Sequence, residues 1–150
     1  MHSQKSFMDD IAATLGGYVA EELVYGDLTT GPSNDLSVVT ALAYDMVTRY
    51  GMSDLIGPVA LVSERAHGEN TMSPEVSAKV DSEVKRIIEE SKVRAREVLT
   101  THRKALDAIA MKLTEVETLE REDFEKLLIA NGITPKEKDV EFEPLVTTTA

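Results

Sequence analysis

Cysteine is absent from this sequence of 150 residues, which excludes disulfides and thiolate metal sites. With only three histidines, a metal site would have to draw on His, Asp or Glu side chains. No apolar run approaches the ~18 residues that a membrane span needs, and residues 1–10 lack the pattern of a signal peptide. The deficit of basic residues leaves a net charge of −11, which disfavours nucleic acid and anionic membrane surfaces as partners. These absences favour a soluble, acidic, intracellular protein or the soluble part of a larger one.

What the sequence does contain is apolar residues at helical spacing. Hydrophobic residues make up 42% of the chain, enough for the core of one domain. The spacing predicts helices over about 7–24 and 35–50, and a long amphipathic stretch that starts at Ser73-Pro74-Glu75 and reaches Leu113 with a break near Thr100-Thr101. A last helix is predicted, capped by Thr118 and ended by Asn131-Gly132. We expect the first helix to continue through Gly16-Gly17, because its apolar stripe continues past them and paired glycines often mark close approach of another backbone.

The remaining segments are short. Gly57-Pro58 opens an apolar run at residues 59–62, which is too short for a helix and predicts an edge strand. The fold class is therefore mainly α, with at most one short edge strand. We expect two packed sublayers, about 1–63 and 73–131, and a flexible tail over 132–150.

Asp35 is the most promising candidate for chemistry. The pattern places it in the first turn of the second predicted helix, which Ser33 or Asn34 would cap, and at the edge of the apolar stripe. A half-buried carboxylate on a rigid element suits a metal ligand. The simpler explanation is an acid that complements the helix dipole, and the spacing alone favours it over a metal ligand.

Glu22 is the second candidate. It shares a stripe with Ile11, Leu15 and Tyr18, so it is predicted to face the core while Glu21 faces away. A buried carboxylate needs a partner, either an arginine such as Arg49 in a structural ion pair or a zinc-bound histidine.

The other polar residues carry weaker signals. The three histidines, at positions 2, 67 and 102, lack the i, i+4 spacing of a zinc helix and are predicted to be structural or solvated. The charged face of residues 79–97 is predicted to be a solvated helix face.

Residues 15–63 carry a set of motifs at fixed spacing. They are Gly16-Gly17, Ala20-Glu21-Glu22, Thr29-Thr30-Gly31, Ser33-Asn34-Asp35, Met46-Val47, Tyr50-Gly51-Met52-Ser53 and Gly57-Pro58. This pattern resembles the FtsH family of ATP-dependent zinc metalloproteases. The resemblance covers roughly residues 5–131, more loosely toward the C-terminal helices.

The resemblance implies a helical peptidase-domain fragment of a membrane-anchored zinc endopeptidase for protein quality control. It assigns Asp35 as the third zinc ligand, with Glu22, Glu21 and Asn34 around it in the second shell. It also implies an edge that pairs with extended substrate. That edge consists of Gly57, Pro58, Val59 and Ala60.

Other parts of the family pattern are not in this sequence. The HExxH helix, with two histidine ligands and the general base, is expected upstream of Met1, and the AAA+ module that binds ATP and the membrane anchor are absent too. The chain alone is therefore expected to be inactive and to bind no zinc tightly. The resemblance implies homo-hexamers, unfolded or membrane protein substrates, and the cytoplasmic face of a bacterial inner membrane. The alternative is a stand-alone, non-catalytic helical assembly or adaptor module, a pseudoprotease.

Overall fold

The computed structural model describes residues 2–62 and 72–135, and these form helices joined by short irregular segments. The prediction of a mainly α fold is confirmed, and no strand occurs in the described ranges. The described residues form two compact units, which divide between Thr101 and His102. The helices are α1 (Gln4–Thr14), α2 (Gly16–Tyr25), α3 (Ser33–Thr48), α4 (Pro74–Thr101), α5 (Arg103–Val116) and α6 (Arg121–Ala130).

The first predicted helix is in fact two helices, which meet at Leu15. The prediction of one continuous helix was wrong: Leu15 N donates to Ile11 O and Leu15 O accepts from Val19 N, so Leu15 is the C-cap of α1 and the N-cap of α2. Leu15 is almost fully buried and faces the core. No heavy atom among the described residues lies within 4 Å of a Cβ built on Gly16 or Gly17, so close backbone approach is not their role. The glycine pair instead lowers helix propensity just after the break.

α3 begins two residues earlier than predicted, at Ser33. Its N-cap is Pro32, without a side-chain hydrogen bond, so neither Ser33 nor Asn34 is the cap. Pro32 is buried, and its carbonyl accepts from Leu36 N at 3.0 Å. The helix ends before Gly51, whose φ of +62° belongs to the left-handed region that favours glycine.

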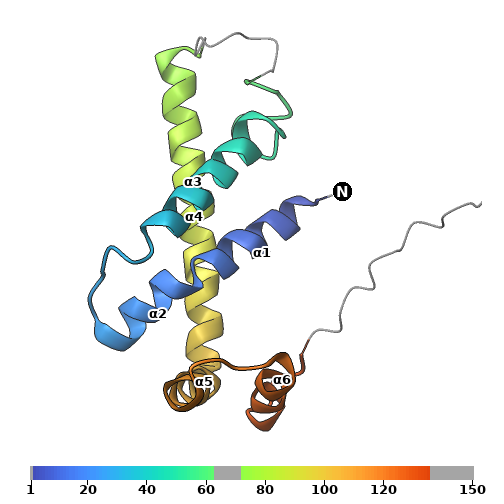
Figure 1. Cartoon of the computed structure of the whole chain (residues 1–150). Coiled ribbons are helices and arrows are strands. Elements are labelled where there is room, and N and C mark those ends of the chain that lie inside the picture. Colours follow the sequence, from blue (N-terminus) through green and yellow to red (C-terminus); the bar gives the residue numbers. More distant parts are fainter. Residues whose placement is uncertain (1, 63–71, 136–150) are drawn as a thin grey trace, which may run out of the picture. The chain divides into compact units, whose positions relative to one another are not determined.

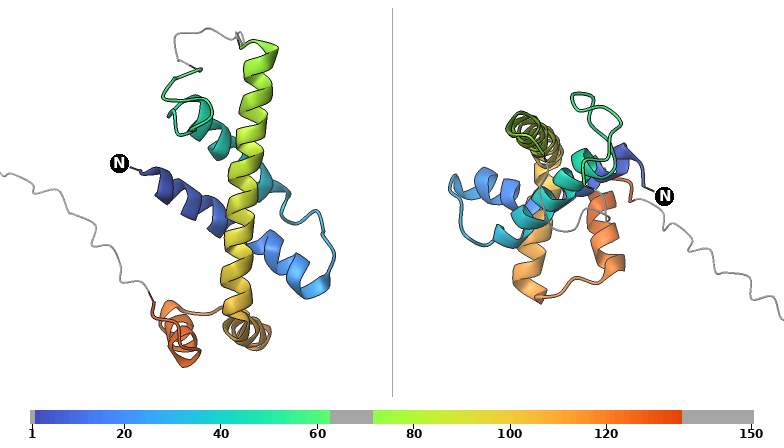
Figure 2. Two further views of the ribbon diagram at one scale, coloured as in Figure 1. Left: turned by 180° about the vertical axis from the view of Figure 1, so that it is seen from behind. Right: turned by 90° about the horizontal axis from the view of Figure 1, so that it is seen from above.

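α4 is the element on which the first unit is built (Figure 1). It begins as predicted at Ser73-Pro74, where Ser73 Oγ accepts from Val76 N at 3.3 Å, and it ends at the predicted break, Thr101. α1, α2 and α3 cross one side of it, which the view from behind in Figure 2 makes plain. The core joins apolar side chains from α1, α3 and α4: Ile11, Leu15, Val39, Ala43, Met46, Val47, Val80 and Ile87.

The segment after α3 is irregular, and the predicted strand at residues 59–62 was wrong. Thr48 O accepts from Leu61 N at 2.7 Å and from Val62 N at 3.2 Å, while Val59 N donates to Gly57 O. The amides of Val59, Leu61 and Val62 thus bond within the loop and to the end of α3, and the described residues contain no neighbouring strand.

The second unit contains a helical pair, α5 and α6, that pack against each other. α5 ends at Glu117, which has a φ of +59°. The N-cap of α6 is Glu120 rather than the predicted Thr118. His67 and most of the predicted tail, residues 136–150, lie outside the described residues. None of the described helices combines the length and apolar character needed to cross a membrane.

Candidate functional site

Asp35 lies in the first turn of α3, where its predicted position placed it. Its side chain is half-buried, and it has no hydrogen bond or ion pair to any other described residue. The free N–H groups of this first turn favour a negative charge nearby. The carboxylate is therefore held by a rigid helix and keeps its oxygens available.

The loop that leads into α3 is fixed by Glu21 of α2. The Glu21 carboxylate accepts from Thr29 N at 3.2 Å and from Thr29 Oγ1 at 3.1 Å. Thr29 Oγ1 in turn accepts from Gly31 N at 3.1 Å. A Cβ on Gly31 would stand 3.2 Å from that hydroxyl and 3.4 Å from the Glu21 carboxylate, so the motif glycine leaves room for this contact. Glu21 thus sets the path of the chain just before Asp35.

Glu22 points to α4 rather than into the loop. Its Oε2 pairs with the Arg96 guanidinium and lies 3.4 Å from Lys92 Nζ. Lys92 Nζ also stands 5.0 Å from the Tyr18 ring centroid. Arg49, the partner suggested from the sequence, pairs instead with Asp45 at 3.6 Å. The half-buried Glu22 carboxylate therefore holds α2 on α4.

The predicted site residues fall into two groups. Glu21 and Asp35 lie on either side of one loop, and Asn34 is exposed beside Asp35 in the first turn of α3. Residues 57–60 follow the other end of α3 and belong to a different loop. Within residues 2–62 and 72–135, no three His, Asp or Glu side chains are grouped closely enough to hold a metal ion. Asp35 is thus a single donor and not a complete site.

The described histidines contribute no further donor to Asp35. The His2 ring stacks on Phe7 with 5.5 Å between ring centroids. His102 is exposed at the start of α5, and its side chain makes no cap hydrogen bond.

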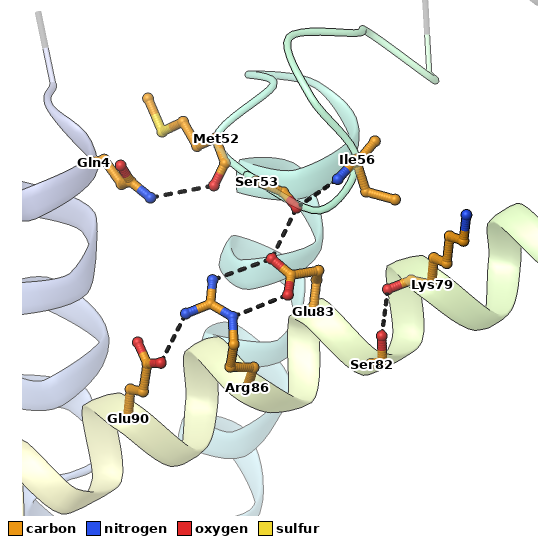
Figure 3. Close-up of polar contacts among 9 residues, drawn as sticks. All are labelled: Gln4, Met52, Ser53, Ile56, Lys79, Ser82, Glu83, Arg86 and Glu90. Carbon is orange, nitrogen blue, oxygen red and sulfur yellow. Dashed lines mark hydrogen bonds and ion pairs between the residues drawn. The ribbon is translucent and has the colours of Figure 1, made fainter.

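A buried polar cluster on α4 was missed by the sequence prediction (Figure 3). Glu83 is only 6% exposed, and its carboxylate accepts from Ser53 Oγ at 2.8 Å and from Arg86 Nε at 2.9 Å. The Arg86 hydrogen bond lowers the pKa of Glu83, against burial, which raises it, and Ser53 adds to the lowering. The sequence does contain a sign of this burial, because Val80, Glu83 and Ile87 lie at helical spacing and Glu83 therefore falls within an apolar stripe. The prediction had instead treated the charged face of residues 79–97, which includes Glu83, as solvated.

Comparison with known proteins identifies the pattern to which these residues belong. The chain is 38% identical to ATP-dependent zinc metalloprotease FtsH 3 of Synechocystis sp. over 88% of its length. It is 36% identical to ATP-dependent zinc metalloprotease FtsH of Bacillus subtilis over 89% of its length, and 38% identical to that of Thermotoga maritima over 84%. It spans only 23%, 22% and 22% of those three relatives. The sequence model described as "Peptidase family M41" matches residues 1–127, and the chain therefore belongs to this peptidase family.

Proposed function

We propose that this chain is the part of an ATP-dependent, membrane-anchored zinc metalloendopeptidase that supplies its aspartate zinc ligand, Asp35. The observation that carries the proposal is the placement of Asp35. It is a half-buried carboxylate in the first turn of a helix, without a partner among the described side chains, after a loop that Glu21 fixes. The proposal is also supported by the chain's membership of a peptidase family and by relatives that are named zinc metalloproteases.

Asp35 fits zinc as one ligand of several. A carboxylate oxygen is among the donors that zinc takes in proteins, and a rigid helix holds its direction. When bound in the complete enzyme, zinc polarises the scissile carbonyl and lowers the pKa of a bound water. One carboxylate cannot hold the ion firmly, so we assign the other ligands and the general base to an HExxH helix elsewhere in the parent protein.

The neighbouring residues of this chain orient Asp35 and receive substrate. Glu21 fixes the loop through Thr29, and the exposed Asn34 would offer its side-chain amide beside the ligand. Glu22 acts at one remove, because its ion pair with Arg96 holds α2 on α4. Residues 57–60 accept extended polypeptide through main-chain contacts, which tolerate many substrate sequences.

The parent protein would work as a homo-hexamer on unfolded or membrane proteins, at the cytoplasmic face of a bacterial inner membrane. ATP would bind only in its AAA+ module. The relatives named ATP-dependent support this reading, and the small fraction of their length that this chain spans leaves room for such modules.

The experiment compares Asp35→Asn with Asp45→Asn in the protein that contains this chain together with its upstream sequence. Asp45 lies on the same helix, and its one ion pair within the described part of the chain is with exposed Arg49, so it is a matched control. We expect Asp35→Asn to lower zinc content, measured by elemental analysis, more than about tenfold, and to abolish casein hydrolysis while ATP hydrolysis persists. Full zinc content and proteolysis in Asp35→Asn would refute the assignment.

The 150-residue chain alone should bind no stoichiometric zinc and hydrolyse no casein. Elemental analysis after dialysis against zinc and a fluorescent casein assay measure both. One zinc per purified chain would show that the donors within it suffice, and would overturn the division of ligands proposed above.

A further inference from the structure

The loop over residues 53–62, called the 53–62 loop below, is fastened at three points to the helices of the first unit. At its start, Gln4 Nε2 of α1 donates to Met52 O at 3.3 Å. At its end, Thr48 O of α3 accepts from Leu61 N and Val62 N. The third fastening, to α4, is the only buried one among the described side-chain hydrogen bonds of the loop, and it involves Ser53.

Ser53 joins the turn to α4 with a single hydroxyl. It is 3% exposed, and its Oγ donates to Glu83 Oε2 at 2.8 Å while accepting from Ile56 N at 3.2 Å. Its carbonyl accepts from Gly57 N at 2.8 Å. Ser53 therefore fixes the turn that precedes residues 57–60, and the hydrogen bond to Glu83 fixes Ser53 against α4 (Figure 3).

Arg86 secures the carboxylate that receives this hydrogen bond. Its Nε and one terminal nitrogen donate to Glu83 at 2.9 and 3.1 Å, and the other donates to Glu90 at 2.8 Å. A bidentate arginine fixes the carboxylate in orientation as well as in charge. A carboxylate this buried would be costly without such a partner.

The outer side of the 53–62 loop is apolar and exposed. Leu55, within the turn that Ser53 closes, is 54% exposed, and Val59, after it, is 50% exposed. The loop is fixed by hydrogen bonds of the Ile56, Gly57 and Leu61 amides, so its exposed apolar side chains can contact a chain without first becoming ordered. This preorganisation lowers the entropic cost of binding.

We propose that Ser53, Glu83 and Arg86 form a latch that fixes the 53–62 loop, so that Glu83 is a positioning residue for the substrate-contacting residues 57–60. The inference rests on the proposed function for its substrate role. The latch itself concerns only contacts within the first unit. The two parts are tested separately.

The latch is tested by hydrogen exchange on the 150-residue chain. Ser53→Ala removes the hydroxyl but leaves the Glu83–Arg86 pair intact, and Glu83→Gln places an amide donor against either Ser53 or Arg86. Both should speed exchange of the Ile56 amide by about 10–100-fold, because one hydrogen bond to a buried charged group is lost. The Val47 amide in the core should not change. Glu90→Gln, which alters an exposed partner of the same arginine, is the matched control and should leave Ile56 unchanged.

Unaltered Ile56 exchange in Ser53→Ala would overturn the latch. If Glu83→Gln unfolds the chain, Ser53→Ala still decides, because no charge is left unpaired in that variant. Faster exchange at Ile56 and Val47 together would show a general loss of stability and would equally overturn a local latch.

The positioning role is tested in the parent protease. Ser53→Ala should raise KM for an unfolded protein substrate about tenfold, with kcat within about twofold and zinc content unchanged. An unchanged KM, or a fall in kcat with zinc loss, would overturn the positioning role while the exchange result stands. If the wild-type protein hydrolyses nothing, the proposed function fails and the substrate role with it, and hydrogen exchange alone then decides whether the latch exists.

Discussion

Gly51 should be the least replaceable of the positive-φ glycines in the first unit. It has a φ of +62°, and a Cβ at this position would lie 3.2 Å from Pro58 Cα and 3.4 Å from Val59 N. The neighbouring atoms belong to the backbone, so they cannot rotate away as a flexible side chain would. We therefore choose Gly51→Ala as the perturbation, with Gly26→Ala as its control. Gly26 has a φ of +66° and no described atom within 4 Å of a built Cβ.

Both substitutions place an L-residue in the left-handed region, and only Gly51→Ala also brings a Cβ against the backbone of Pro58. An L-residue in the left-handed region costs roughly 1–2 kcal/mol, partly offset by about 0.4–1 kcal/mol from the smaller conformational freedom of the unfolded chain. Gly26→Ala should thus lower the free energy of unfolding by about 1 kcal/mol. Gly51→Ala adds the contact with Pro58, and overpacking of this kind costs about 1–3 kcal/mol. The expected total for Gly51→Ala is about 2–4 kcal/mol.

Urea denaturation followed by circular dichroism at the helix band measures both values, since the chain has no tryptophan to report by fluorescence. The difference in free energy of unfolding between the two variants isolates the contact between Gly51 and Pro58. Equal losses for Gly51→Ala and Gly26→Ala would refute the predicted cost of that contact.

Three other predictions concern side chains of the first unit. The pKa of Glu83 is lower in the folded chain than in the unfolded chain, so the ionised carboxylate stabilises the fold above the unfolded-state pKa, and this stabilisation is lost as pH falls through the folded-state pKa. The difference in free energy of unfolding between wild type and Glu83→Gln should therefore shrink below about pH 4. A difference that widens there would contradict the ion pair. Met46→Ala should lower the free energy of unfolding by about 2–5 kcal/mol in urea titrations, because Met46 is fully buried. Met111 is exposed, so Met111→Ala should change that free energy by less than about 0.5 kcal/mol, and similar losses for the two variants would argue against Met46 as a core residue. Glu21→Ala removes the acceptor of the Thr29 amide and hydroxyl, so hydrogen exchange at Thr29 should accelerate, and unchanged exchange would show that the loop before Asp35 is fixed by other means.

The helices of the first unit were largely predictable because their signals are local. Apolar spacing located α3 and α4, and the Ser73-Pro74 start and the break at Thr101 follow from cap chemistry and a lapse in the pattern. The break at Leu15 was not predictable from spacing, since the buried apolar positions Ile11, Leu15 and Val19 keep helical spacing across it. Periodicity records which side of a helix is buried and is insensitive to a small change in its direction.

The strand prediction failed because strand formation depends on a neighbour. The run at residues 59–62 has strand composition, but its amides reach Thr48 O, and the described residues offer no strand to pair with. The prediction of Asp35 came from a motif, and its position in the first turn of α3 is as expected. Its role as a ligand stays a prediction. Glu83 was missed because an acid within a charged stretch is usually solvated, and only the apolar residues on either side of it reveal that it faces inward.

Two contacts of the first unit are held at a fixed spacing by α4. Arg96 anchors the α2 side, which leads to Asp35, and Glu83 anchors the 53–62 loop, about 20 Å away along the same helix. Each inserted residue turns a helix by about 100°, so one extra residue between these anchors would leave at most one of them facing its partner. Natural variation in α4 between residues 83 and 96 should therefore take the form of substitution and not of insertion or deletion. The number of α4 residues between Glu83 and Arg96 thus sets the spacing between the 53–62 loop and the helix that leads to Asp35.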